Sequence, residues 1–193
     1  MPKPAKAEPV PVAQSGAHPL MVRVWDPLVR LFHWSLVLSF VIAWFSPVSS
    51  AALHHWAGYA AAGLVGLRVV WGVAGTPHAR FSDFVKSPRI VLGYLVDMVK
   101  GRESRHIGHN PAGGAMVLAL MAGMVTASVS GYMMTTDRYF GVSWVETFHR
   151  ISVHVLLFLV VAHLAGVAFA SLRHRENLVR AMITGLKRAP TSR

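Results

Sequence analysis

The sequence predicts an all-α membrane protein, a four-helix transmembrane bundle with both termini in the cytoplasm. Of its 193 residues, 53% are hydrophobic and only 14% are charged, with a mean hydropathy of +0.45. Soluble domains carry about 25% charged residues, so this composition indicates a membrane protein. Four apolar stretches each approach the roughly 20 residues that cross a bilayer. The basic residues are also distributed asymmetrically along the chain.

The four predicted spans lie in one domain, residues 22–188. They are residues 28–46, 53–75, 113–134 and 149–172. Residues 1–21, which are rich in Pro and Ala, are expected to form a disordered cytoplasmic tail, and residues 189–193 form a second tail. Residues 87–101 place apolar side chains at helical spacing next to charged ones, which predicts a helix on the membrane surface.

The positive charges predict the orientation. Most of the 19 Lys and Arg residues fall in the N-terminal tail, the loop between the second and third spans, and the C-terminal tail. Only Arg138 and Arg150 lie on the opposite side. Cytoplasmic flanks carry the excess of Lys and Arg, so both termini and the long loop are expected in the cytoplasm. The same distribution explains the net charge of +11 without nucleic-acid binding. The absence of cysteine excludes disulfides, iron–sulfur clusters and thioether-attached haem.

Three histidines occupy the last span. His149 and His163 are 14 residues apart, so on a helix they differ by about 40° and share a face, separated by about 21 Å along the axis. His154 lies about half a turn away from His163 and faces elsewhere. One helix face therefore presents two imidazoles at two membrane depths.

Two further histidines match these depths. His33 lies near the cytoplasmic start of the first span, level with His163, and His54 lies near the outer start of the second span, level with His149. A six-coordinate haem takes one ligand on each side of its ring. The pattern thus predicts two b-type haems, an inner one on His33 and His163 and an outer one on His54 and His149. Any one of these histidines alone could be an ordinary interfacial residue.

The choice between His54 and its neighbour His55 depends on a glycine. Gly58 lies one turn beyond His54 on nearly the same face, where the missing side chain allows a flat macrocycle to approach the backbone. His55 would point about 100° away. We expect His54 to be the ligand, while His55 stays open.

Other polar residues accompany the predicted inner haem. Arg30 and Arg68 are expected to neutralise its propionates, the alternative being cations that extend to the membrane surface. His109 and Asn110 precede the third span and are candidates for a quinone pocket. An ordinary loop and helix start, with Pro111 in the first turn, is the alternative.

These residues carry a resemblance to a known family. The sequence contains FHW in the first span, HxxxGY and RVVWG in the second, HARFSDF after it, GHNPAGG before the third, and RHRENLVRAMITG after the last. This combination, over residues 22–188, resembles the bacterial cytochrome b-561 proteins and the cytochrome b subunits of nickel–iron hydrogenases. Relatives often carry an acidic residue after the third ligand, where this chain has Arg150.

The resemblance implies a di-haem b-type cytochrome of the bacterial inner membrane. Such a protein carries electrons between the quinone pool (ubiquinone or menaquinone) and a redox partner, either a periplasmic cytochrome or a hydrogenase-like enzyme. Its four ligands correspond to His33, His54, His149 and His163, and a homodimer stays open. An alternative function is a quinone-coupled superoxide oxidase. A metal transporter is a weaker alternative, because the spans contain almost no Asp or Glu.

Overall fold

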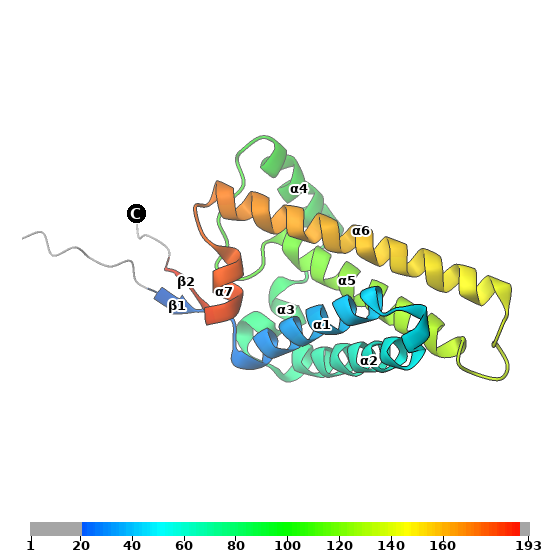
Figure 1. Ribbon diagram of the computed structural model, residues 1–193. Helices are drawn as coiled ribbons and strands as arrows, with labels where there is room; N and C mark the ends of the chain where they lie inside the picture. The colour runs from blue at the N-terminus through cyan, green and yellow to red at the C-terminus, as the bar shows by residue number, and fades with distance from the viewer. Residues whose placement is uncertain (1–20, 190–193) are drawn as a thin grey trace, which may run out of the picture.

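The computed structural model describes residues 21–189, and four of its helices are long and apolar enough to cross a membrane (Figure 1). They are α1 (Pro27–Phe45), α2 (Ala51–Ala74), α5 (Pro111–Met133) and α6 (Ser143–Arg173). The predicted helical membrane fold with four spanning helices is therefore confirmed. The two predicted tails, apart from Met21 and Ala189, lie outside the described residues.

Polar side chains next to prolines begin two of these helices. Asp26 accepts a hydrogen bond from the backbone N–H of Val29 (2.9 Å) at the start of α1, and Asn110 accepts one from Gly113 (2.7 Å) at the start of α5. Pro27 and Pro111 occupy the first helical position, where no backbone N–H is needed. The sequence of the loop before each span thus determines where the helix begins.

The fourth spanning helix begins earlier than expected. It starts at Ser143, six residues before the predicted residue 149. The segment before His149 contains Glu146, which lowers its hydropathy, yet a helix can continue past the bilayer because its backbone hydrogen bonds are internal. His149 therefore lies well inside α6 and not at its first turn.

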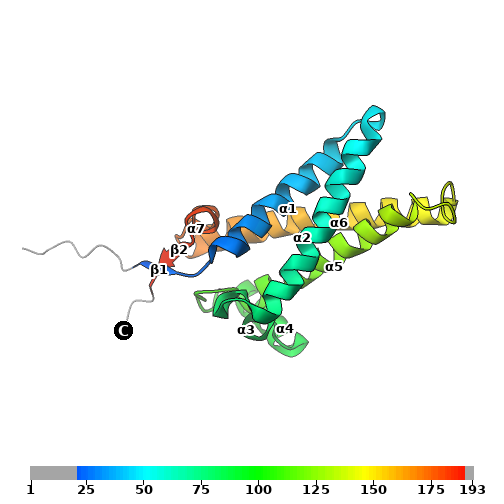
Figure 2. The same ribbon diagram turned by 90° about the horizontal axis from the view of Figure 1, so that it is seen from below.

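The four long helices form two hairpins. α1 packs against α2, α5 packs against α6, and α2 joins the two hairpins through α5. Figure 2 shows that the hairpins lie at an angle and separate toward one end. We call this the loop end, because the 3₁₀ helix η1 (Val48–Ser50) and the loop 134–142 lie there. The opposite end, where the short strands lie, is the sheet end.

The sheet end holds the shorter elements. They are β1 (Met21–Arg23), η2 (Pro77–Ala79), α3 (Phe81–Phe84), α4 (Pro88–Val99), α7 (Leu178–Thr184) and β2 (Leu186–Arg188). β1 and β2 pair antiparallel, with Val22 opposite Lys187. This small sheet corrects the purely helical expectation, since a pair of three-residue strands gives no periodic signal in the sequence.

A compact core closes the sheet end. Val24, Trp25 and Val29 from the start of the chain pack with Ala79 after α2 and Ala181 of α7. The backbone N–H groups of Val24 and Trp25 also donate to the carbonyl of Gly185 (2.9 and 3.2 Å). Burial of these apolar groups holds both ends of the described chain against the same end of the bundle.

The helix α4 covers Pro88–Val99 within the segment 87–101, and its place on the membrane surface stays a prediction. It packs against α5, and Tyr94 is its buried residue. Large apolar side chains on its other sides are exposed, including Leu92 and Val99. This pattern fits a helix that lies at the edge of the bilayer.

Candidate functional site

The structure brings His54 of α2 and His149 of α6 together near the loop end. Their ring centres are 6.3 Å apart, and the ring planes are inclined at 81°. An imidazole nitrogen binds a metal at about 2 Å, and the ring centre lies about 1 Å behind that nitrogen, so two imidazoles on one metal have centres about 6 Å apart. The separation of this pair therefore fits two ligands on opposite sides of one ion.

Each of these two histidines is held by the neighbouring helix of its own hairpin. The Nδ1 of His54 lies 2.8 Å from the carbonyl oxygen of Ala43 on α1. The Nδ1 of His149 lies 3.1 Å from the carbonyl of Ala127 on α5 and 3.0 Å from the hydroxyl of Ser130. A carbonyl only accepts, so each Nδ1 carries the proton and each Nε2 keeps its lone pair. Histidine ligands of metals are typically oriented in this way.

The residues that hold His149 were not expected from the sequence, where the small residues of α5 indicated only close helix packing. Ser130 is fully buried, and its hydroxyl donates to the carbonyl of Thr126 (2.8 Å), which leaves its lone pairs for the N–H of His149. A Cβ at Gly131 would lie 3.1 Å from the Cε1 of His149. The positions of Ser130 and Gly131 in the sequence do not reveal these contacts, because the contacts depend on the register between α5 and α6.

The neighbouring candidates differ in their surroundings. His55 is exposed, and its ring lies against that of His54 (6.1 Å between centres). Gly58 is half-buried, and a Cβ there would meet no atom within 4 Å. His154 is exposed, and its Nδ1 donates to the carbonyl of Arg150 (2.7 Å). Its ring packs against that of Trp44 on α1, with 6.0 Å between the ring centres. The imidazoles of His55 and His154 are thus exposed, whereas those of His54 and His149 are half-buried.

The second predicted pair lies toward the sheet end. His33 of α1 is packed edge-on against Trp34 (5.0 Å between ring centres), and His163 lies on α6, 14 residues beyond His149. The Nδ1 of His33 is buried and has no hydrogen-bond partner among residues 21–189. This end of the site therefore contains an unpaired imidazole, in contrast to the pair near the loop end.

Two arginines also lie toward the sheet end. Arg68 is only 7% exposed; its Nη2 donates to the carbonyl of Ala79 (2.9 Å), and its guanidinium lies over the ring of Phe81 (5.2 Å). Arg30 donates from Nη1 to the carbonyl of Ile183 in α7 (2.5 Å). The Nη1 of Arg68 and the Nε of Arg30 are buried without a partner in the described chain. Such donors suit carboxylates, and burial distinguishes Arg68 from a cation that extends to the membrane surface.

His109 lies beside this group as a half-buried residue whose ring nitrogen Nδ1 is buried. Its ring lies between Trp25 (4.6 Å between ring centres) and Phe84 (4.8 Å), and its Nδ1 has no partner among the described residues. Burial, followed by the positive charge of Arg68, lowers the pKa of His109 to about 3, so the imidazole is neutral near pH 7. Asn110 uses its side-chain oxygen to cap α5, which gives it a structural role at the helix start.

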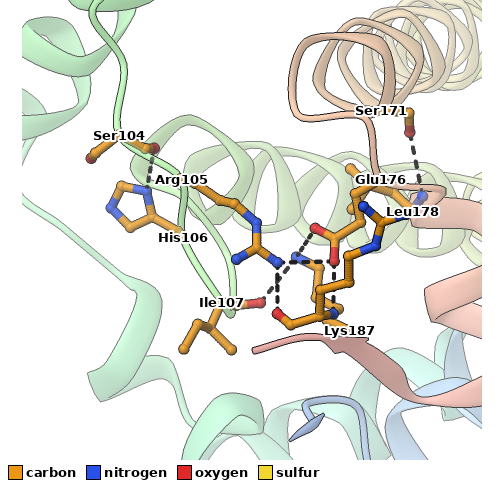
Figure 3. A network of polar contacts seen from close by, with 9 residues as sticks. Ser104, Arg105, His106, Ile107, Ser171, Glu176, Leu178 and Lys187 are labelled. Atoms are coloured by element: carbon orange, nitrogen blue, oxygen red, sulfur yellow. Dashed lines mark hydrogen bonds and ion pairs between the residues drawn. The ribbon is translucent and has the colours of Figure 1, made fainter. Parts of the chain in front are cut away.

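A network of ionic contacts holds the loop that carries His109 (Figure 3). Arg105 donates to Glu176 (3.0 Å) and to the carbonyl of Arg188 (2.7 Å), and the Nζ of Lys187 donates to the carbonyl of Ile107 (3.0 Å). Burial alone would raise the pKa of Glu176, but the hydrogen bonds from Arg105 and from the backbone of Arg188 outweigh it and lower the pKa. We call these residues the Glu176 clamp.

The pair near the loop end fits a haem with two histidine ligands. The pair near the loop end has the required separation and protonated Nδ1 atoms. The pair near the sheet end is accompanied by buried guanidinium donors that suit propionates. α6 thus carries imidazoles at two levels, His149 and His163, about 21 Å apart along its axis.

Comparisons with known proteins identify the family of the chain. Residues 24–185 match the family model described as prokaryotic cytochrome b561. A probable Ni/Fe-hydrogenase B-type cytochrome subunit of Azotobacter vinelandii is 27% identical, with 85% of this chain and 87% of the relative covered. A protein of the same description from Rhizobium leguminosarum bv. viciae is 22% identical, with the same shares covered. No solved structure matches the chain significantly.

Proposed function

The chain belongs to the prokaryotic cytochrome b561 family, and we propose that it carries electrons through two b-type haems across the bacterial inner membrane, between the quinone pool and a redox partner. Membership of this family and the four apolar helices make it a multi-pass membrane cytochrome of b type that transfers electrons. The number of haems, their ligands, the orientation and the partners are the proposal.

The observation that carries the proposal is the pair His54 and His149. Their ring centres are 6.3 Å apart, and each Nδ1 is bound to a carbonyl of an adjacent helix, which leaves Nε2 for iron. We assign the outer haem to this pair and the inner haem to His33 and His163. A haem supplies reversible one-electron chemistry when it is bound.

The side chains of this chain then have defined roles. The four histidines would hold the two haem irons, so that no substrate would bind iron and electrons would pass at the haem edges. Arg30 and Arg68 bind the inner propionates through their unpaired donors. Gly58, which has open space beside it, leaves room for the macrocycle near His54.

The orientation places the sheet end in the cytoplasm, as the Lys and Arg distribution supports. His109 and Asn110 then border a pocket for ubiquinone or menaquinone near the inner haem. The relatives are named as hydrogenase subunits, which supports a partner of the hydrogenase type at the loop end. A periplasmic cytochrome is the other candidate partner, and the chain could also pair with a second copy of itself.

The number of haems tests this proposal directly. Purified haem-loaded protein should contain two b-type haems per chain by pyridine haemochrome quantitation, and a reduced-minus-oxidised spectrum should show both. Addition of a soluble quinone to the reduced protein should reoxidise them. A ratio of one haem or none, in protein shown to be fully loaded, would refute the two-haem assignment.

A further inference from the structure

A polar pocket of about 430 Å³ opens at the sheet end beside His109. It lies between the segment that contains η2 and α3 and the loop 106–109. Its titratable members are His78, Asp83, Lys86, His106 and His109. This pocket has no part in haem binding as assigned above.

The side chains of the pocket run from the surface to the interior. Asp83 and Lys86 are on exposed residues, and His78 and His106 are half-buried. His109 is at the inner limit, where its ring packs between Trp25 and Phe84. The pocket therefore connects the surface of the sheet end with a buried imidazole.

His78 lies directly beside the backbone that precedes His109. A Cβ on Gly108 would be 3.3 Å from the Nδ1 of His78, so this imidazole rests against the Gly108 backbone. His109 is also near enough to Arg68 and His163 for their charges to affect its pKa. It thus lies in the pocket and in the neighbourhood of His163.

The Glu176 clamp fixes the outer wall of the pocket. The Nζ of Lys187 binds the carbonyl of Ile107 (3.0 Å), and Arg105 is bound by Glu176 (3.0 Å), as Figure 3 shows. The Nδ1 of His106 also donates to the carbonyl of Ser104 (3.0 Å), which orients its ring. The two surface imidazoles are therefore held by neighbouring backbone and not left on a free loop.

The chemistry of a quinone makes such a route necessary. Reduction of a quinone to a quinol takes up two electrons and two protons, and the reverse reaction releases them. The helices α1, α2 and α5 contain no Asp or Glu, and α6 has only Glu146, near the loop end. Carboxylates within the spans therefore cannot supply protons at the level of His163.

We propose that this pocket is the proton-exchange site of the quinone reaction, in which His78 and His106 pass protons between water and His109. Imidazole is the side chain best suited to gain and lose protons near neutral pH. His109, which stays neutral, donates its N–H proton toward the quinone oxygen and receives a replacement from the pocket side. The inference rests on the proposed function, because it requires a quinone near the inner haem.

Two electron acceptors separate proton exchange from electron transfer. The haem-loaded protein is reduced and then mixed in a stopped-flow instrument with decylubiquinone, which takes up protons, or with ferricyanide, which takes up none. The variants are His78→Ala, His106→Ala and the double variant. The control is His154→Ala, the same change at an exposed histidine near the other end of the bundle. Haem content and spectra are recorded for each protein.

We expect the double variant to react with decylubiquinone at least about ten-fold more slowly than the wild type, with unchanged KM, because proton transfer by a positioned group contributes about 100-fold or more. Its reaction with ferricyanide should be unchanged, and added imidazole should restore the quinone rate. His154→Ala should behave as wild type.

Other outcomes overturn the inference. Unchanged quinone rates in the double variant would show that protons take another route. Equal slowing with both acceptors would show a defect in electron transfer and not in proton exchange. Failure of the wild type to react with any quinone would refute the quinone part of the proposed function itself, which separates the two failures.

Discussion

The contact between Ser130 and His149 gives a quantitative prediction about one of the two haems. Ser130 is fully buried, and its hydroxyl accepts from the Nδ1 of His149 at 3.0 Å. Ser130→Ala removes this acceptor, while the carbonyl of Ala127 stays at 3.1 Å. The imidazole therefore keeps its protonation state but loses one of its two acceptors.

The expected cost is that of a single hydrogen bond, about 1 to 1.5 kcal/mol. Since 1.4 kcal/mol corresponds to a factor of ten, the outer haem should bind about five- to ten-fold more weakly. This lies at the lower limit of the 10- to 100-fold losses that follow removal of groups supporting metal ligands. The inner haem, about 21 Å further along α6, should be unaffected.

Haem transfer to an excess of apomyoglobin measures this effect. In Ser130→Ala, one of the two haems should leave more readily and the other should be retained as in the wild type. Ser152→Ala is the matched control, because Ser152 is a similarly buried serine on α6 whose hydroxyl donates to the carbonyl of Phe148 (2.7 Å). Equal weakening in the control, or weakening of both haems in Ser130→Ala, would refute the reasoning.

Three further predictions concern ligands and pH. His149→Ala should lower the haem content from two to one per chain, whereas the exposed His154→Ala should keep both; the reverse result in haem quantitation would contradict the ligand assignment. Because the pKa of Glu176 is lowered from 4.5, the clamp is stable above that value and is lost as the pH falls through the lowered pKa. Hydrogen exchange of the loop 101–110 should therefore become faster in the wild type below about pH 4.5. In Glu176→Gln it should already be faster than in the wild type at pH 7. Identical exchange profiles of the two proteins would exclude the clamp. The pKa of His109 is lowered to about 3, so its contribution to stability is complete above its ordinary value of 6.5 and declines as the pH falls toward 3. Thermal unfolding should consequently depend less on pH in His109→Leu than in the wild type between pH 7 and 5, and equal slopes would contradict the burial of a neutral imidazole.

Much of the membrane fold follows from local properties of the sequence. Hydropathy over about 20 residues identifies a span without knowledge of its neighbours, because each spanning helix satisfies its own backbone hydrogen bonds in lipid. The 100° rotation per residue likewise places His149 and His163 on one face and His154 on another. These predictions required only the amino-acid sequence. The predicted spans begin and end within a few residues of the observed helices, except at the start of α6.

The contacts around the candidate ligands could not be predicted in the same way. The acceptors for His54 and His149 are the backbone carbonyls of Ala43 and Ala127, and a carbonyl is present at every residue. Which carbonyl lies opposite an imidazole depends on the register and angle between two packed helices. The position of Gly131 against the His149 ring has the same origin.

The sequence by itself determined that the chain has four helices long and apolar enough to cross a membrane and that His149 and His163 recur on one face of the last one, since both are consequences of local hydropathy and helical periodicity. Only the tertiary structure decided which groups hold those histidines, and that Glu176 meets Arg105, 71 residues away along the chain, as well as Lys187. The physical reason is that hydrogen bonds and ion pairs act over a few ångströms. Residues distant in sequence therefore interact only when packing of the helices, β1 and β2 brings them together.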